Sequence, residues 1–454
     1  MSTKTASTAT ATAQSAAPLD ASAPLHALYA KIVARQARAG VVGLGYVGLP
    51  LLTEFARAGF EATGFDLDRE RVQLINRGHS YIPDVPGEEF RRLVEAGKLR
   101  GADDWAELAN MDAISICVPT PLRKTKDPDL SYIVSAVDAV AERLRPGQLV
   151  VLESTTYPGT TDEVVLPRLE QTGLKVGKDF LLAFSPERVD PGNARFQTAN
   201  IPKVVGGITP ACTQAAQALY GCCVGRVVPV SSARAAEMAK LLENTFRNVN
   251  IGLVNEMALL CHAMDLDVWE VIAAAASKPF GFMAFAPGPG LGGHCIPIDP
   301  VYLSWRARAH GIEPRLIEVA QQVNARMPEY VVEMVAAALN NRQRAVRGAK
   351  VHILGIAYKK DVGDLRESPA LDIMHLLRQR GAELRYSDPY IPELKEPGWD
   401  MKAVGVEAVK ECDCAVIVAD HSAVNYDRVL AEAPAVVDTR NALAGRKSEK
   451  LYRL

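Results

Sequence analysis

The sequence predicts an α/β protein in which two Rossmann-like, doubly wound domains are joined by a long central helix and a helical domain. Three observations lead to this prediction. Short apolar strand patterns alternate with helical patterns near both ends of the chain, as in parallel sheets. An apolar repeat with helical spacing runs through residues 231–264 without a break. The last third of the chain then restarts the strand–helix rhythm of the first third.

The composition agrees with a globular protein of this class. Of 454 residues, 48% are hydrophobic and 23% are charged, and the formal net charge is −2. This balance gives the chain no global attraction to nucleic acid or to an anionic membrane, and we expect neither as a partner. No apolar run reaches the roughly 18 residues that a membrane span needs.

The cysteines indicate a cytoplasmic protein. Eight of them are scattered along the chain, and no signal peptide precedes them. This pattern is typical of reduced thiols in a reducing compartment. Cys412 and Cys414 form a C-x-C pair, but no second pair or histidine cluster completes a zinc site. We therefore expect two core thiols there and no bound metal.

We divide the chain into four parts. Residues 1–24 are rich in Ser, Thr and Ala, cannot bury enough apolar surface to offset their ordering entropy, and are expected to be a disordered tail. A transit peptide is the weaker alternative, because the segment contains no arginine. Residues 25–230 are the first α/β domain, residues 231–338 the central helical domain, and residues 339–454 the second α/β domain.

The first α/β domain opens on a strand, a glycine turn and a helix. A short apolar run ends at residue 42, and a Gly-x-Gly-x-x-Gly turn follows it. An amphipathic helix is predicted over residues 49–58, and a second strand over residues 60–65 ends in Asp66. Three further strands are predicted at residues 113–118, 149–153 and 181–184.

The glycine turn predicts a dinucleotide site. Gly43 permits the tight turn, Gly45 lets backbone amides approach a pyrophosphate at the helix N-terminus, and Gly48 lets the helix and strand pack closely. Asp66 would accept hydrogen bonds from the adenosine ribose, and a carboxylate there disfavours a 2′-phosphate. The sequence therefore favours NAD over NADP, with a purely structural turn as the alternative.

A second motif surrounds Cys295. Glycines at 290, 292 and 293 precede the cysteine and would expose its thiol on a loop that a ligand can approach. Asp299 lies four residues further on and could reach the same cavity. Cys295 is therefore a candidate nucleophile, and a packed thiol in a Gly/Pro-rich turn is the alternative. We expect His294 to be structural.

Polar residues at two other places are weaker candidates. Lys240 and Asn244 are four residues apart, so they share one face of the predicted central helix and interrupt its apolar repeat. Thr155 and Glu187 each follow a predicted strand, where α/β sheets bind ligands. A solvated side chain is the alternative for each of them taken alone.

The second α/β domain repeats the strand, loop, helix, glycine, strand and aspartate order of the first. Strands are predicted at residues 351–356 and 383–387, with a helix over 369–380 between them, and later strands at 414–419 and 435–438. The turn after the first strand lacks the Gly-x-Gly-x-x-Gly pattern, so we expect a different ligand and no second dinucleotide.

Taken together, the motifs resemble the nucleotide-sugar 6-dehydrogenases, the UDP-glucose/UDP-N-acetylhexosamine dehydrogenase family. The resemblance covers essentially the whole chain beyond the tail, and the Gly-Gly-x-Cys-x-Pro-x-Asp signature is its most specific part. The matching segments are residues 43–48, 153–155, 185–187, 240–244, 292–299 and 359–368. Within the family, the residues around Cys295 and Ser368 look most like the bacterial UDP-N-acetylglucosamine 6-dehydrogenase branch.

The resemblance implies a four-electron oxidation of a primary alcohol to a carboxylate with NAD as coenzyme. The Cys295 thiolate would hold the sugar first as a thiohemiacetal and then as a thioester, which water hydrolyses. Lys240 and Asn244 would stabilise the oxyanions. Asp299 and Thr155 would hold a proton-relaying water, and Glu187 would act as general base in hydrolysis.

The resemblance also implies the binding residues and a homodimer or higher homo-oligomer formed through the central helix. The C-terminal domain would bind the UDP part of the substrate. The implied coenzyme residues are Gly43, Gly45, Tyr46, Val47, Gly48, Asp66, Thr120 and Thr155. The implied substrate residues are Glu187, Arg188, Lys240, Asn244, Gly292, Tyr358, Lys359 and Arg440.

If the branch resemblance holds, the enzyme converts UDP-N-acetylglucosamine to UDP-N-acetylglucosaminuronate for a surface polysaccharide such as a capsule or O-antigen. UDP-glucose and UDP-N-acetylmannosamine are the alternative substrates. A two-electron enzyme resembling the 3-hydroxyacid dehydrogenases is a second hypothesis, although it would leave Cys295 and the third domain idle. A catalytically silent sensor of nucleotide sugar and NAD is a third.

Overall fold

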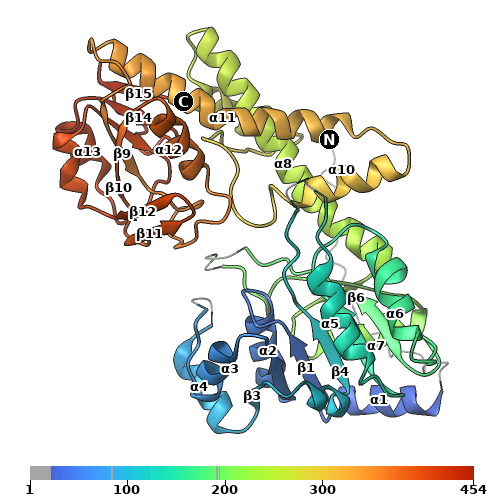
Figure 1. Ribbon diagram of the computed structural model, residues 1–454. Coiled ribbons are helices and arrows are strands. Elements are labelled where there is room, and N and C mark those ends of the chain that lie inside the picture. Colours follow the sequence, from blue (N-terminus) through green and yellow to red (C-terminus); the bar gives the residue numbers. More distant parts are fainter. Residues whose placement is uncertain (1–21, 83–84, 124, 126, 191–192, 194) are drawn as a thin grey trace, which may run out of the picture.

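The computed structural model describes residues 22–454 except 83–84, 124, 126, 191–192 and 194. Two α/β domains lie at opposite ends of the molecule, and long helices connect them (Figure 1). Most of the predicted tail lies outside the described residues. Its last two residues belong instead to helix α1 (Ala23–Val33), which begins with a proline at a favourable position and buries Leu25, Leu28 and Ile32.

The N-terminal domain is built on an eight-stranded sheet in the order β3-β2-β1-β4-β5-β6-β7-β8. The first six strands of this order are parallel, and β7 runs antiparallel to β6. The strands are β1 (Arg38–Val42), β2 (Glu61–Phe65), β3 (Leu99–Ala102), β4 (Ala113–Ile116), β5 (Leu149–Leu152), β6 (Leu181–Phe184), β7 (Lys203–Gly207) and β8 (Val227–Pro229). The strand order reverses between β1 and β4, so the predicted doubly wound fold is confirmed and its ligand crevice lies at their carboxyl ends.

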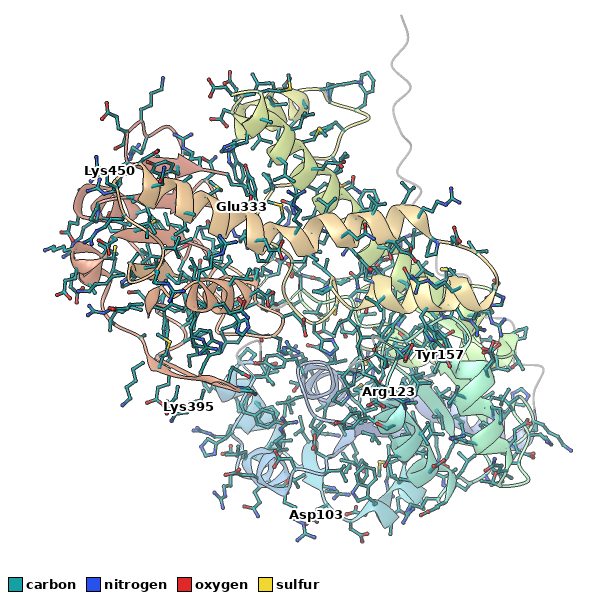
Figure 2. All side chains as sticks on the ribbon, turned by 45° about the horizontal axis from the view of Figure 1, so that its top comes forward. Asp103, Arg123, Tyr157, Glu333, Lys395 and Lys450 are labelled. Atoms are coloured by element: carbon teal, nitrogen blue, oxygen red, sulfur yellow. The ribbon has the colours of Figure 1, made fainter. Side chains whose placement is uncertain are left out.

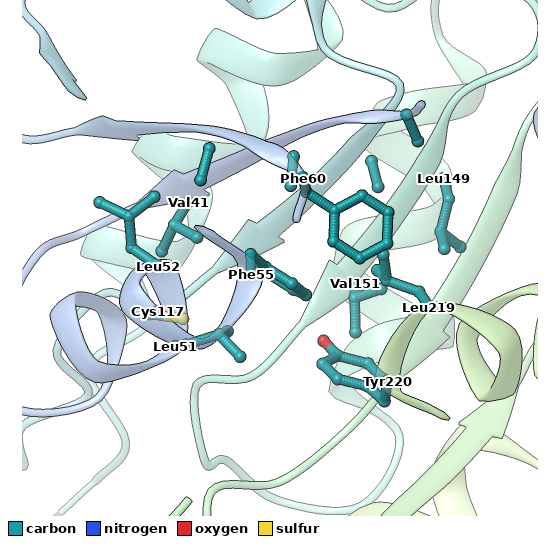
Figure 3. Close-up of a cluster of buried hydrophobic side chains, with 14 of the residues drawn as sticks. Val41, Leu51, Leu52, Phe55, Phe60, Cys117, Leu149, Val151, Leu219 and Tyr220 are labelled. Carbon is teal, nitrogen blue, oxygen red and sulfur yellow. The ribbon is translucent and has the colours of Figure 1, made fainter. Parts of the chain in front are cut away.

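Helices cover both faces of this sheet, and each face has its own apolar core. They are α2 (Gly48–Arg57), α3 (Arg69–Asn76), α4 (Gly87–Glu95), η1 (Trp105–Asn110), α5 (Ser131–Ala141), η2 (Thr161–Val165), α6 (Leu166–Glu170) and α7 (Pro210–Gly221). Figure 3 shows part of one core, where Phe55 of α2 packs between Phe60 and Tyr220 with both ring centroids 6.1 Å away. This packing holds α7 against one face of the sheet.

The central helical domain begins with α8 (Ala233–Ala263), which agrees with the long helix predicted from the apolar repeat. It continues with α9 (Val268–Ala276), α10 (Asp299–Ala309) and α11 (Arg315–Asn340). Helices α8 and α11 cross at Gly252, where a Cβ atom would lie 3.0 Å from the Cα of Ala320. The apolar stripe of α8 is only partly covered by this chain: Leu241 is fully buried, but Leu242 and Phe246 are 62% and 47% exposed.

The C-terminal domain has a five-stranded parallel sheet in the order β10-β9-β13-β14-β15 and a separate antiparallel hairpin of β11 and β12. Its strands are β9 (Lys350–Leu354), β10 (Glu383–Ser387), β11 (Glu393–Glu396), β12 (Trp399–Lys402), β13 (Cys414–Ile417), β14 (Val436–Asp438) and β15 (Leu451–Arg453). Its helices are α12 (Pro369–Gln379), η3 (Val406–Glu411) and α13 (Tyr426–Glu432). The predicted second Rossmann-like unit is present. The strand predicted at residues 383–387 coincides with β10, and the other three predicted strands are one or two residues shorter in the structure.

The turn after β9 is closed by a side chain of its own domain. Asp388 follows β10 and accepts hydrogen bonds from the backbone N–H groups of Ile356 and Ala357, at 2.8 and 3.0 Å. His421, which is fully buried, contacts the same carboxylate oxygen. These two amides are therefore already paired within the domain.

Charged side chains extend from both α/β domains. In Figure 2, Lys395 and Lys450 extend from the C-terminal domain and Asp103 from the far end of the N-terminal domain. Among the described residues, no helix is both long enough and apolar enough to cross a bilayer. All eight cysteines lie in the described part of the chain and are free thiols, with Cys412 and Cys414 buried as predicted.

Candidate active site

A cavity of about 2040 Å³ lies where the N-terminal domain, α8, the Cys295 loop and the C-terminal domain meet. Single small-molecule pockets are usually about 300–1,000 Å³, so this cavity has room for two ligands side by side. The glycine turn after β1 lines one part of it, and Lys240, Asn244, Cys295 and Asp299 line another.

The glycine turn fits a dinucleotide. Gly43 has a φ of +89°, and a Cβ atom there would lie 2.8 Å from the carbonyl oxygen of Cys117. A Cβ atom at Gly48 would lie only 1.8 Å from the carbonyl oxygen of Gly43, which confirms the close helix–strand packing. At Gly45 no protein atom lies within 4 Å of the Cβ position, so the backbone is open to the cavity, as binding of a pyrophosphate requires.

Asp66 stands at the carboxyl end of β2 in the lining of the same cavity. Its Oδ2 accepts a hydrogen bond from the N–H of Leu44 at 2.8 Å, and its Oδ1 accepts one from the N–H of Asp68 at 2.9 Å. These bonds fix the carboxylate and leave further lone pairs for ribose hydroxyls. Arg71, which the motif analysis did not single out, also lines the cavity and lies 3.6 Å from Oδ2.

The other residues predicted to bind the coenzyme also line the cavity. These are Tyr46, Val47, Thr120 and Thr155. Thr120 is buried, and its carbonyl oxygen accepts a hydrogen bond from the hydroxyl of Tyr302 on α10. Tyr46 is 45% exposed, and the guanidinium of Arg366 lies 4.9 Å from the centre of its ring. The cavity wall is therefore continuous from the glycine turn to the C-terminal domain.

The Cys295 loop is held by the C-terminal domain. The N–H of Gly293 donates to the carbonyl oxygen of Arg366 at 2.9 Å. Cβ atoms built at Gly292 and Gly293 would lie 2.6 and 2.9 Å from Tyr358, which lines the cavity as predicted. The sequence analysis attributed these glycines to approach by a ligand, but the structure shows that they allow close packing against Tyr358.

Helix α8 places a cation and an amide beside the thiol. Lys240 is only 6% exposed, and the side-chain N–H of Asn244 donates to Oδ2 of Asp299. Asp299 is the first residue of α10, and its backbone N–H donates to the carbonyl oxygen of Cys295 at 2.9 Å. The four predicted residues from two helices and a loop are therefore brought together.

The positive charge of Lys240 opposes the effect of burial on the pKa values of Cys295 and Asp299. Burial raises the pKa of the Cys295 thiol, while the positive charges of Lys240 and Arg366 act to lower it. Burial also raises the pKa of Asp299 to about 6, against the charge of Lys240 and the hydrogen bond from Asn244. Lys240 thus favours the ionised form of both neighbours, and the thiolate gains most from it once a ligand excludes water.

Glu187 and Arg188 follow β6 and line the cavity beside Thr155. Oε1 of Glu187 accepts hydrogen bonds from the N–H groups of Arg188 and Val189, at 2.7 and 2.8 Å. The guanidinium of Arg188 pairs with Glu243 of α8 at 2.7 Å. The strand end therefore fixes both side chains at the cavity wall, where the sequence predicted them.

Lys359 and Arg440 are not among the described residues that line the cavity, although the resemblance implies that both bind substrate. The ammonium of Lys359 lies 2.8 Å from Asp190 of the N-terminal domain. The Nε of Arg440 donates to the carbonyl oxygen of Val418 at 2.8 Å, and its guanidinium packs against Gly288. Internal partners hold both side chains in the structure without substrate.

Several residues that support the site were missed in the sequence analysis. Asn248 of α8 donates to the carbonyl oxygen of Ile296, next to the candidate nucleophile, at 3.2 Å. Lys203 and Glu153 form a buried ion pair at 2.7 Å behind the cavity wall. Glu153 lies in the matching segment 153–155 but was given no role. No local motif marks Asn248 or Lys203, and only their polarity in apolar segments could have drawn attention to them. In the described part of the chain, no cluster of His, Cys, Asp and Glu is arranged to hold a metal ion.

Comparison with known proteins gives three consecutive family matches. Residues 37–224 match the NAD-binding domain, residues 234–326 the central domain, and residues 352–445 the UDP-binding domain of the UDP-glucose/GDP-mannose dehydrogenase family. The three matched domains together cover most of the chain, and each of them contributes residues to the lining of the cavity.

Individual relatives agree with these matches. The chain is 37% identical to a UDP-N-acetyl-D-mannosamine dehydrogenase of Pyrococcus horikoshii, over 86% of this chain and 92% of that protein. It is 36% identical to a UDP-N-acetyl-D-glucosamine 6-dehydrogenase of Pseudomonas aeruginosa, over 78% and 83% of the two chains. A solved structure of the UDP-D-ManNAc dehydrogenase from Pyrococcus horikoshii aligns with a TM-score of 0.84 at 35% identity, covering 92% of this chain and 98% of that chain.

Proposed function

The chain belongs to the UDP-glucose/GDP-mannose dehydrogenase family, and as an NAD-dependent UDP-sugar dehydrogenase we propose that it oxidises C6 of UDP-N-acetylglucosamine to a carboxylate. The family resemblance and the NAD coenzyme predicted from the sequence are confirmed by these matches. The observation that carries the proposed chemistry is the gathering of Lys240, Asn244, Cys295 and Asp299 in one cavity with the dinucleotide turn.

The coenzyme would be held by the glycine turn and by Asp66. NAD, when bound, supplies the hydride acceptor for each of the two oxidations. The open backbone at Gly45 would hold the pyrophosphate, and the fixed carboxylate of Asp66 would accept hydrogen bonds from the ribose hydroxyls. Thr120 and Thr155 complete the wall between this part of the cavity and Cys295.

Cys295 acts as the nucleophile. After the first oxidation its thiolate adds to the C6 aldehyde and forms a thiohemiacetal, so the reactive aldehyde does not escape. The second oxidation converts this adduct to a thioester. Lys240 and Asn244 stabilise the negative charge that develops on the C6 oxygen in these steps. The burial of Lys240 supports this role, because its charge acts there in a low dielectric.

Two carboxylates take the protons. Asp299, with its pKa raised to about 6, holds with Thr155 the water that accepts the alcohol proton. Glu187 activates the water that attacks the thioester, which releases the sugar carboxylate and the Cys295 thiol. Glu187, Arg188 and Gly292 line the substrate part of the cavity, and Tyr358 closes it. Lys359 and Arg440 would contact the diphosphate after exchanging their present partners.

The identity of the sugar is the finer part of the proposal. The relatives include enzymes named for UDP-N-acetylmannosamine and for UDP-N-acetylglucosamine at nearly equal identity. The segment around Cys295 supports the second, and the product would then feed a surface polysaccharide such as a capsule or O-antigen. UDP-glucose and UDP-N-acetylmannosamine are the competing substrates.

An NADH-formation assay with these three UDP-sugars tests the proposal. We expect fastest turnover with UDP-N-acetylglucosamine and two NADH per sugar consumed. A preference for another sugar would overturn the substrate assignment. One NADH per sugar, or a Cys295→Ala variant that still forms the acid at the wild-type rate, would overturn the covalent mechanism. The two-electron hypothesis predicts accumulation of the aldehyde, and the sensor hypothesis predicts no NADH.

We further propose that the exposed apolar face of α8 binds a second copy of the chain. Leu242, Leu253 and Leu260 are each at least 50% exposed, and Leu316 of α11 is 78% exposed. Apolar patches of this kind commonly mark protein interfaces. A homodimer or higher homo-oligomer would thus form through the central domain, residues 231–338, with the α/β domains 25–230 and 339–454 on either side. The free cysteines support a cytoplasmic location.

A further inference from the structure

A buried ammonium group lies behind Glu187. Lys203 of β7 is 4% exposed, and its Nζ lies 2.7 Å from Oε2 of Glu153 and 3.9 Å from Oε2 of Glu187. It also donates to the carbonyl oxygen of Pro186 at 3.4 Å. Both carboxylates belong to residues that line the cavity, whereas Lys203 is not among the described lining residues. The lysine therefore contacts two carboxylates of the cavity lining without lining the cavity itself.

The position of Lys203 is fixed by the core. The hydroxyl of Tyr220 donates to Oε1 of Glu153, and the Tyr220 ring lies 5.0 Å from the ammonium of Lys203. Ser115 contacts the same hydroxyl at 3.3 Å. Figure 3 shows that Tyr220 is itself packed against Phe55 and Val151 in the apolar core. Buried charges persist only when paired, so this arrangement holds the lysine in one place.

The charge of Lys203 is retained. Burial alone would lower the pKa of Lys203, but the negative charges of Glu153 and Glu187 outweigh burial and raise it. Burial raises the pKa of Glu153, and Lys203 opposes that rise. The lysine is thus a permanent cation 3.9 Å from the carboxylate that the mechanism uses as a base.

The other oxygen of Glu187 is held by the backbone. Its Oε1 accepts from the backbone N–H groups of Arg188 and Val189. The negative charge of Glu187 also acts on Glu153, and on Cys117 and Cys295 when these titrate. The guanidinium of Arg188 is engaged with Glu243 instead. Lys203 is therefore the cation that the structure directs at the free oxygen of Glu187.

We propose that Lys203 is a positioning residue for hydrolysis of the thioester, because its ammonium group holds the carboxylate of Glu187 at the cavity wall. This inference rests on the proposed function and deepens it. In the step concerned, the water oxygen bonds to the acyl carbon while Glu187 takes a water proton. The C–S bond then breaks, its electron pair stays on Sγ of Cys295, and the sugar carboxylate is released.

Two substitutions should shift the pH dependence of thioester hydrolysis in opposite directions. Lys203→Met removes the cation, so the pH at which hydrolysis becomes fast rises by about one unit. Glu153→Gln removes a negative neighbour and frees the ammonium for Glu187, so the same pH falls. General damage to the fold cannot give effects of opposite sign. Glu153→Gln alone serves as the test if Lys203→Met does not fold.

The experiment follows NADH formation and intact protein mass after rapid mixing of the enzyme with NAD and the UDP-sugar that the wild type oxidises. We expect Lys203→Met to release two NADH per site rapidly and then retain the acyl group on Cys295. At pH values below the shifted acidic limb of the pH–rate profile, the variant should form the sugar acid about tenfold more slowly than the wild type. Lys203→Arg should restore most of the rate.

The matched control is Glu170→Gln/Lys175→Met, which removes an exposed ion pair of 3.2 Å remote from the cavity and should leave the profile unchanged. If the wild type gives no burst of two NADH, the proposed function fails. If the wild type gives the burst and the pH profile of Lys203→Met, or of Glu153→Gln where Lys203→Met does not fold, matches that of the wild type, the proposed function survives and the role of Lys203 is refuted.

Discussion

Alanine substitutions at Gly48 and Gly45 separate the packing of the first turn from its coenzyme binding. A Cβ atom at Gly48 would lie 1.8 Å from the carbonyl oxygen of Gly43, whereas real Cβ contacts essentially never fall below 3.0 Å. Helix α2 must therefore move away from β1 by about 1 Å. Overpacking of this kind costs about 1–3 kcal/mol, which lowers the Tm of a domain of this size by about 2–10 °C.

Gly45→Ala is the matched substitution. No protein atom lies within 4 Å of its Cβ position, and its φ is not in the left-handed region, so the domain should keep its stability within about 0.5 kcal/mol. The added methyl group would instead occupy the space that a pyrophosphate needs near the backbone amides. We expect the affinity for NAD to fall at least about tenfold, which corresponds to about 1.4 kcal/mol.

Thermal unfolding of the free proteins and calorimetric titration with NAD measure the two effects. Gly48→Ala should lose stability together with NAD affinity, and Gly45→Ala should lose NAD affinity alone. Wild-type NAD affinity in Gly45→Ala would refute the placement of the pyrophosphate at this turn. An unchanged Tm in Gly48→Ala would refute the argument that helix α2 and β1 require a glycine between them.

Four further predictions concern catalysis and assembly. Lys240→Met should lower kcat about 100- to 1,000-fold with little change in KM, since the lost charge acts on the oxyanion; a loss confined to KM would contradict this role. Because burial raises the pKa of Asp299 to about 6 and Lys240 opposes the rise, the acidic limb of kcat/KM should lie near pH 6 and move upward in Lys240→Met. Asn248→Ala removes a donor to the loop carbonyl at 3.2 Å and should lower both kcat and Tm modestly, by about 1 kcal/mol in stability; an unchanged kcat would show that the loop needs no such anchor. Leu242→Glu should convert the oligomer to monomers in light scattering, whereas an unchanged mass would exclude this face as the interface.

Local patterns were sufficient to predict the elements that depend on few residues. The tight turn at Gly43, the packing at Gly48 and the long helix α8 all follow from short-range spacing, and the structure bears them out. The strands β7 and β8 have no such signal, because they are short and lie at the reversed edge of the sheet. The helical start at Ala23 also escaped prediction, since its apolar positions follow directly on a polar tail.

The candidate site was predictable in its residue types and less so in its contacts. The bond between Asn244 and Asp299 joins residues 55 apart, and the Lys203–Glu153 pair joins residues 50 apart, so no spacing rule could find either. Such pairs depend on which strand ends and helix faces meet. Lys359 and Arg440 were assigned from the resemblance, and the structure instead gives them partners within the protein.

The loop that carries Cys295 has attachments on both sides of a domain boundary. Asn255 of α8 accepts from the N–H of Gly288 at 2.8 Å, whereas the carbonyl of Arg366 in the C-terminal domain holds Gly293. Every residue that we assign to the chemistry precedes position 339, yet a fragment ending there would lack half of these anchors. We expect such a fragment to contain the complete set of reactive groups and yet to lack activity. The third domain would thus be needed to build the catalytic site as well as to bind the substrate.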